Sequence, residues 1–183
     1  MNLSSSVASP EAPPADHLVV FAHGKESGPW GTKITQLAEV AKRRGYAVIS
    51  PDYSFTMDPQ ARVAHLKALA PQARKTLVLV GSSMGGYVSA MACEALKPQA
   101  LFLMAPALYF EGWDEEPTGI PARTTVVHGW QDDIVPVERG QRFAARHGAA
   151  LHCIDSGHTL NDQLPLLGLL FDDLLRRVLE ATP

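Results

Sequence analysis

Cysteine is scarce in this sequence, which has two such residues, Cys93 and Cys153, in a chain of 183. Two cysteines cannot build the disulfide framework of a small secreted domain, and their spacing does not match that of a metal site. The sequence therefore predicts a cytoplasmic protein that has neither disulfides nor a bound metal.

Long apolar runs and basic blocks are also missing. No stretch approaches the ~20 apolar residues that a membrane-spanning helix needs, and the N-terminal residues lack the charged and apolar regions of a secretory signal. The longest basic run is Lys42-Arg43-Arg44, and the formal net charge is −3. We therefore expect no membrane and no nucleic-acid partner.

What remains is the composition of a single soluble domain, with 46% hydrophobic and 19% charged residues. Residues 1–16 are dominated by proline, serine and alanine, and contain too little apolar surface to offset the entropy of ordering. We expect residues 1–16 to form a disordered lead-in and residues 17–183 to form the domain.

From residue 17 onward, short β-branched or apolar runs alternate with longer segments of helical spacing. This alternation is typical of a parallel sheet covered by helices on both faces. Strands are expected at 17–22, 46–50, 75–81, 99–104, 123–128 and 149–154. Apolar stripes predict helices at 34–44, 60–70, 138–147 and 160–180. The segment 87–96 is apolar nearly all round and should form the most buried helix.

The segment 80–87, VGSSMGGY, places two serines between glycines directly after a predicted strand. Gly81 and Gly85 flank Ser83 in the order G-x-S-x-G, whereas Ser82 lacks glycines in these places. A strand that turns into a helix within about one residue strains the serine, projects its Oγ above the sheet and requires small neighbours. Ser83 is therefore the candidate nucleophile. The alternative is a glycine-rich turn without a chemical role.

A serine nucleophile needs a base that takes its proton. Catalytic groups of an open parallel sheet gather beyond the carboxyl ends of its strands, which argues against the histidines predicted within strands or on outward helices, namely His17, His65, His147 and His152. His23 and His128 each precede a glycine at a strand end, as turn residues do. His158, in the loop before the last helix, is the candidate base, although a solvated loop histidine is the alternative.

The base needs an acid that orients it, and the segment HGWQDDIVP supplies two aspartates directly after the strand 123–128. Either Asp132 or Asp133 can take this role. The alternative is a turn in which both aspartates bind backbone amides.

With GSSMGG, HGWQDDIVP and SGH in the chain order serine, acid, histidine, the sequence resembles a small bacterial α/β-hydrolase. The family's H-G-x-x-D-x-x-V-P pattern selects Asp132. The resemblance also implies that His23 and Gly24 begin an oxyanion loop, in which the backbone amide of Lys25 pairs with that of Met84.

The resemblance covers nearly the whole chain from residue 17. It implies a three-layer α/β/α sandwich, a trimmed form of the fold with a parallel six-stranded sheet in the order 2-1-3-4-5-6. Where larger members carry a helical lid, this chain has only the segment 105–121.

Aromatic residues crowd the loops predicted at the carboxyl edge of the sheet. The predicted substrate pocket contains His23, Trp30, Tyr109, Trp113 and Trp130. Aromatic side chains bury large apolar areas, so such a pocket suits an acyl chain or an aromatic ester. The alternative is that these aromatics only pack the loop 105–121 onto the body.

The expected activity is the cleavage of carboxylic esters or thioesters through an acyl-enzyme, with no metal or organic cofactor and with a small-molecule substrate as the partner. The same residues permit perhydrolysis or peptide cleavage, and the fold also supports ligand-binding or signalling proteins without turnover. The glycine-rich segment HGKESGPWGTK lacks the G-K-[ST] order of a phosphate-binding loop, which argues against a nucleotide site.

Overall fold

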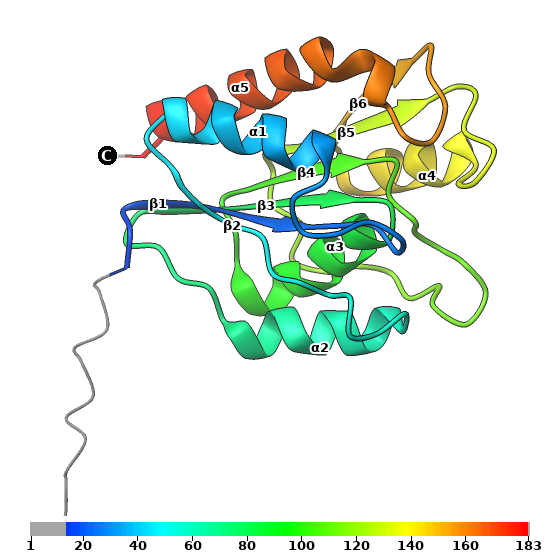
Figure 1. Ribbon diagram of the computed structural model, residues 1–183, viewed down its shortest axis with the longest axis horizontal. Coiled ribbons are helices and arrows are strands. Elements are labelled where there is room, and N and C mark those ends of the chain that lie inside the picture. The colour runs from blue at the N-terminus through cyan, green and yellow to red at the C-terminus, as the bar shows by residue number, and fades with distance from the viewer. Residues whose placement is uncertain (1–13, 183) are drawn as a thin grey trace, which may run out of the picture.

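The computed structural model describes residues 14–182, in which six strands form one sheet (Figure 1). The strands are β1 (His17–Ala22), β2 (Ala47–Ile49), β3 (Thr76–Ser82), β4 (Ala100–Met104), β5 (Thr124–Gly129) and β6 (Ala150–Ile154). Their order is β2-β1-β3-β4-β5-β6, and every neighbouring pair is parallel. The predicted sheet and its strand order are thereby confirmed.

Side chains of each central strand alternate between two hydrophobic cores, one on each face of the sheet. On β1, Val19 and Phe21 belong to one core, whereas Leu18 and Val20 belong to the other. Successive side chains of a strand point to opposite faces, so a strand covered on both sides needs apolar residues throughout. This explains why β3 is buried along its whole length.

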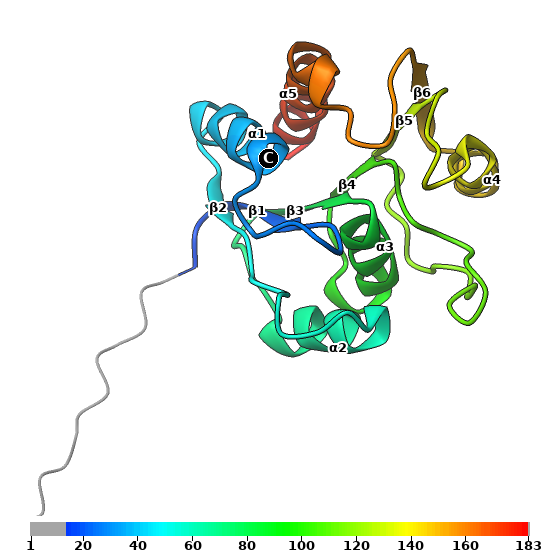
Figure 2. The same ribbon diagram turned by 45° about the vertical axis from the view of Figure 1, so that its right-hand side comes forward.

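Helices cover both faces of the sheet (Figure 2). One face carries α1 (Thr32–Arg43) and α5 (Leu164–Glu180), and the other carries α2 (Pro59–Leu69), α3 (Met84–Leu96) and α4 (Val137–His147). This is the predicted three-layer α/β/α sandwich. The prediction for the central helix is also confirmed, because nine of the 13 residues of α3 are buried.

Two helix starts differ from the sequence prediction by three residues or more. The predicted helix 160–180 is divided into a short 3-10 helix, η1 (Asn161–Gln163), and α5. Leu160 has a φ of 55°, and Pro165 occupies the first turn of α5, where its missing N–H costs no hydrogen bond. α3 begins at Met84, three residues before the apolar segment that predicted it, because the chain turns into the helix directly after β3.

The predicted lead-in, residues 1–16, falls mostly on residues 1–13, which lie outside the described part of the chain. The carbonyl oxygen of Asp16 accepts a hydrogen bond from the amide of Thr76 at 3.0 Å, and its carboxylate pairs with Arg74 at 2.6 Å. The chain therefore enters the domain beside the start of β3. Within the described residues, no helix combines the length and the apolar character that crossing a membrane requires.

The segment 105–121, which follows β4, is anchored on α4. Arg139 donates hydrogen bonds to two backbone carbonyls of this segment, one of them that of Tyr109. The Tyr109 hydroxyl donates to the Glu116 carboxylate at 2.8 Å, and Nε2 of His147 lies 2.9 Å from the same carboxylate oxygen. These contacts tie the segment to α4 at several points along its length.

Candidate active site

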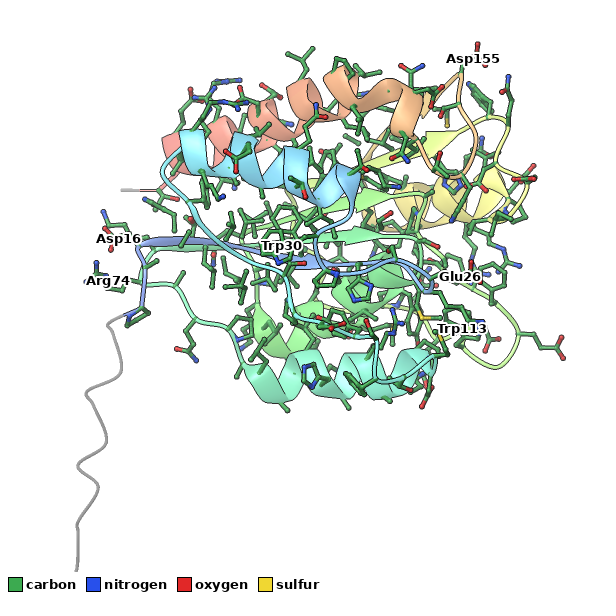
Figure 3. The ribbon with its side chains drawn as sticks, in the orientation of Figure 1. Asp16, Glu26, Trp30, Arg74, Trp113 and Asp155 are labelled. Atoms are coloured by element: carbon green, nitrogen blue, oxygen red, sulfur yellow. The ribbon has the colours of Figure 1, made fainter. Side chains whose placement is uncertain are left out.

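The carboxyl ends of the strands point to the end of the molecule where Figure 3 shows Glu26 and Trp113. Ser83 lies at this end, between β3 and α3, with a φ of 55° and a ψ of −120°. Such a backbone conformation is strained in a non-glycine residue, by about 1–3 kcal/mol. It is held because the Ser83 amide donates to the carbonyl of Met104 and the Ser83 carbonyl accepts from the amide of Ala107, both at 2.9 Å.

The two glycines that flank Ser83 are required by close backbone packing. A Cβ on Gly81 would lie 2.2 Å from the carbonyl oxygen of Gly85, and a Cβ on Gly85 would lie 1.9 Å from that of Ala22. Both distances are far below van der Waals contact. The G-x-S-x-G pattern therefore reports a turn in which β1, β3 and α3 touch through their backbones.

Three residues far apart in the sequence form one line of hydrogen bonds. Nε2 of His158 lies 3.0 Å from Oγ of Ser83, and Nδ1 of His158 lies 2.8 Å from Oδ2 of Asp132. His158 comes from the loop after β6 and Asp132 from the loop after β5. The structure thus brings together the three side chains that the sequence suggested as nucleophile, base and acid.

Asp132 is oriented by contacts to both of its carboxylate oxygens. Its side chain is fully buried, and Oδ1 accepts hydrogen bonds from the amides of Ile134 at 3.0 Å and Val135 at 2.8 Å. Oδ2 is left to face His158 and also lies 3.2 Å from Nε2 of His128. The geometry selects Asp132 over its exposed neighbour Asp133.

His128 is a site residue that sequence reasoning treated as a turn residue. It is fully buried beneath Asp132, and its Nε2 also lies 2.9 Å from the carbonyl oxygen of Val135. It therefore braces the loop that carries Asp132. The available signal was the position of His128 at the end of β5, directly before the loop that carries Asp132.

The loop 23–25 is held from behind by the buried side chain of Arg62. Its guanidinium donates to the carbonyl oxygens of His23 at 3.5 Å, Gly24 at 3.1 Å and Lys25 at 3.2 Å. In a trans peptide the C=O of one residue and the N–H of the next point in opposite directions. The carbonyl of Gly24 faces Arg62, so the amide of Lys25 points away from Arg62.

His23 supports this same loop and does not line the cavity. Its ring is fully buried, with Nδ1 2.8 Å from the carbonyl oxygen of Gly24 and Nε2 accepting from the amide of Tyr53 at 2.9 Å. Burial lowers the pKa of His23 and outweighs the hydrogen bond to Gly24. The neutral ring therefore donates through Nδ1 and accepts through Nε2.

A cavity of about 610 Å³ opens above Ser83. Lys25 and Met84, whose amides the sequence suggested as oxyanion donors, both line it. Its apolar wall consists of Ile34, Ala107, Phe110, Trp113, Ile134 and Val135. No group of three metal-ligating side chains occurs in residues 14–182.

Of the five residues predicted for the pocket, the structure places only Trp113 in the cavity wall, where it stacks on Phe110 with ring centres 5.2 Å apart. Trp30 is half-exposed in a groove between α1 and α5, and Trp130 is 57% exposed. Tyr109 and His23 are buried behind their loops. The sequence places all five residues at the carboxyl edge of the sheet, but this position does not determine whether a side chain in a loop faces the cavity or points away from it.

Comparisons with known proteins agree with this architecture. A comparison with curated proteins found no match. A Xanthomonas campestris protein assigned to the alpha/beta superfamily of hydrolases is 31% identical, with a TM-score of 0.80 over 88% of this chain and 99% of that chain. A second protein of that organism, described as a serine hydrolase without a lid, is 26% identical, with a TM-score of 0.68 over 96% and 88%.

Mouse alpha/beta hydrolase domain-containing protein 10 is 20% identical and shares the fold, with a TM-score of 0.69 over 88% of this chain and 90% of that chain. A family model described as the alpha/beta hydrolase family matches residues 19–182, nearly all of the described chain. With this match, and with the sheet order and the strained serine turn, the chain belongs to the alpha/beta hydrolase family.

Proposed function

We propose that the protein is a serine hydrolase that cleaves carboxylic esters or thioesters through an acyl-enzyme. The observation that carries this proposal is the line of hydrogen bonds from Ser83 through His158 to Asp132 beside an apolar cavity. The 26% identical structure described as a serine hydrolase without a lid also supports it.

In the first step, Oγ of Ser83 attacks the carbonyl carbon of the substrate while Nε2 of His158 accepts the hydroxyl proton. This requires that Nδ1 of His158 carry the other ring proton and donate it to Asp132. Two backbone amides occupy Oδ1 of Asp132, so Oδ2 remains aimed at His158. The acid therefore fixes the tautomer that leaves Nε2 free to act as the base.

The negative charge that develops on the carbonyl oxygen is stabilised by the amides of Lys25 and Met84. Each such donor typically contributes about 3 kcal/mol to the transition state. The Met84 amide is the first of α3, so the positive end of the helix dipole adds to the effect. His158 then gives its proton to the leaving alcohol or thiol, and water releases the acyl group from Ser83 by the reverse sequence.

The cavity wall suits an acyl group that is apolar or aromatic. Phe110 and Trp113 form a stacked pair, and Trp113 also meets the ring of Tyr87 edge-on, with ring centres 5.1 Å apart. Both aromatic side chains belong to the segment anchored on α4. We infer that this pair supplies a fixed surface for the acyl part of the substrate.

Labelling with a fluorophosphonate probe followed by peptide mass spectrometry tests the proposal. We expect the label on Ser83 in the wild type and in Ser82→Ala, and no label in Ser83→Ala. Ser82 is the matched control because it adjoins Ser83 and lines the same cavity. A label that survives Ser83→Ala would contradict the assignment. A folded wild type that takes no label would favour a binding protein instead.

A further inference from the structure

Lys33 enters the wall of the cavity above Ser83 from the first turn of α1. Its ammonium donates a hydrogen bond to the carbonyl oxygen of Thr159 at 2.5 Å. Thr159 directly follows His158 and lines the same cavity. The amine therefore lies beside the loop that delivers the proposed base, although the mechanism above assigns it no role.

The charge of Lys33 has no carboxylate partner within 4.0 Å among residues 14–182. Burial lowers the pKa of Lys33 to about 8, and attraction by Asp132 offsets only part of this effect. Asp132 already accepts hydrogen bonds from its own loop and faces His158. A partly desolvated ammonium of this kind is stabilised by any anion that enters the cavity.

Other charges around the cavity do not compete for this ammonium. Among the described residues that line the cavity, Glu26 is the one with a carboxylate side chain, and it is exposed. The acidic residues Glu111, Asp114 and Glu115 do not line the cavity. The N-terminus of α1 also lies at this wall, and it has neither a side-chain cap nor an acidic residue in its first turn. The positive end of the helix dipole is therefore uncompensated there and adds positive potential to the cavity.

We infer that Lys33 binds an anionic group of the substrate, a carboxylate or a phosphate, while Ser83 attacks the ester or thioester bond. This inference rests on the proposed function and narrows its substrate class to acyl compounds that carry a negative charge. The apolar wall formed by Phe110 and Trp113 accommodates the uncharged part of such a substrate, and the ammonium of Lys33 binds the anionic group.

Two matched pairs of substrates separate the possible positions of the anion. The pair p-nitrophenyl hydrogen glutarate and p-nitrophenyl valerate places a carboxylate, or none, on the acyl part. The pair 4-acetoxybenzoate and its methyl ester places a carboxylate, or none, on the leaving group. For each pair, the readout is the ratio of kcat/KM for the anionic substrate to kcat/KM for the neutral one.

The variants are Lys33→Met, Lys33→Arg and Lys42→Met, compared with the wild type. Lys42 is the matched control, because it lies on the same helix, is exposed and already pairs with Glu39 at 2.8 Å. We expect Lys33→Met to lower the ratio at least tenfold in one pair, mainly through KM. We expect Lys33→Arg to keep the ratio within about threefold and Lys42→Met to leave it unchanged.

The ratio distinguishes binding from support of the loop. If Lys33 only holds Thr159, Lys33→Met will lower kcat/KM equally for both members of each pair, and unchanged ratios in both pairs would overturn the inference. A fall in the glutarate pair places the anion on the acyl part, and a fall in the benzoate pair places it on the leaving group. Either result supports the inference.

The pH dependence gives an independent readout. Lys33 is charged below its pKa of about 8, so the wild-type ratio should fall as the pH rises from 7 to 9.5. The other titratable groups around it are Lys25, Glu26, His158 and Asp132, and all remain in Lys33→Met. Any pH dependence that these groups cause would appear in both proteins. We expect the ratio of Lys33→Met to stay flat, and an equal pH dependence in both proteins would contradict the inference.

A binding measurement keeps the inference separate from the proposed activity. Monomethyl glutarate, with its charge on the acyl part, and 4-acetoxybenzoate, with its charge on the leaving group, are each titrated by calorimetry into Ser83→Ala and into Ser83→Ala/Lys33→Met. Binding that weakens at least tenfold in the double variant supports the anion site, even if the wild type hydrolyses none of the esters and takes no label. Equal binding of each ligand by both variants, or no binding of either ligand, overturns it.

Discussion

Arg62 offers the sharpest test of how the loop 23–25 is positioned. The side chain is fully buried on α2, and its donors go to backbone carbonyls: those of His23, Gly24 and Lys25, and that of Thr56 at 2.9 Å. Arg62→Met keeps most of the volume and removes every donor. Arg62→Lys keeps the charge and removes the planar fork that reaches several carbonyls together.

The structure sets the size of the expected effects. In Arg62→Met the Gly24 carbonyl keeps only its contact to Nδ1 of His23, so the peptide between Gly24 and Lys25 is held less firmly and the amide of Lys25 is less well directed. Loss of one donor to the oxyanion typically costs about 3 kcal/mol, or 10²- to 10³-fold in kcat. Buried carbonyls that lose their donor lower the free energy of unfolding, and removal of the buried charge offsets part of this loss. The expected net decrease in the free energy of unfolding is about 2–4 kcal/mol.

The assay is steady-state hydrolysis of p-nitrophenyl butyrate, with active sites counted by fluorophosphonate labelling. We expect Arg62→Met to lower kcat at least 100-fold with little change in KM, and Arg62→Lys to recover part of the loss. Methylguanidine should partly restore kcat of Arg62→Ala by filling the vacated site. If folded Arg62→Met retains wild-type kcat, then Arg62 does not position the oxyanion donor.

Three further changes test other parts of the site. Asp132→Asn should lower kcat about 10³- to 10⁴-fold by favouring the wrong tautomer of the base, whereas Asp133→Asn should stay within threefold in the same ester assay. Gly85→Ala should cost more than about 4 kcal/mol in urea unfolding or prevent folding, because its Cβ would lie 1.9 Å from a backbone oxygen of β1. Trp113→Ala should flatten the dependence of kcat/KM on acyl length from acetate to decanoate, and Trp130→Ala, exposed by 57%, should not.

The sheet could be predicted because its strands are covered on both faces. Such strands read as continuous apolar runs, and each predicted strand lies within one residue of the observed one at either end. The Ser83 turn was also predictable, since close backbone contacts at Gly81 and Gly85 exclude any side chain there. In both cases the physical requirement acts on the residue type itself.

The walls of the cavity could not be predicted in the same way. Trp30 and Trp113 are both tryptophans in loops at the same edge, yet one lies in an outer groove and the other in the cavity. The difference arises because Phe110 and Trp113 lie on a segment that is tied to α4 by Arg139 and by the contact of Glu116 with His147. Those contacts join residues about 30 positions apart, and no local pattern records them.

The burial of Arg62 could not be predicted from the local sequence either. On a helix at the surface of a domain, such as α2, an arginine normally marks the solvent face, yet this one is the largest fully buried side chain of the described chain. It is buried because the carbonyls of a loop almost forty residues earlier satisfy its donors. The loop in turn needs a donor behind it if its amides are to face forward. The sequence predicts neither the burial of Arg62 nor the direction of the amides in the loop 23–25, because each depends on contacts with the other segment.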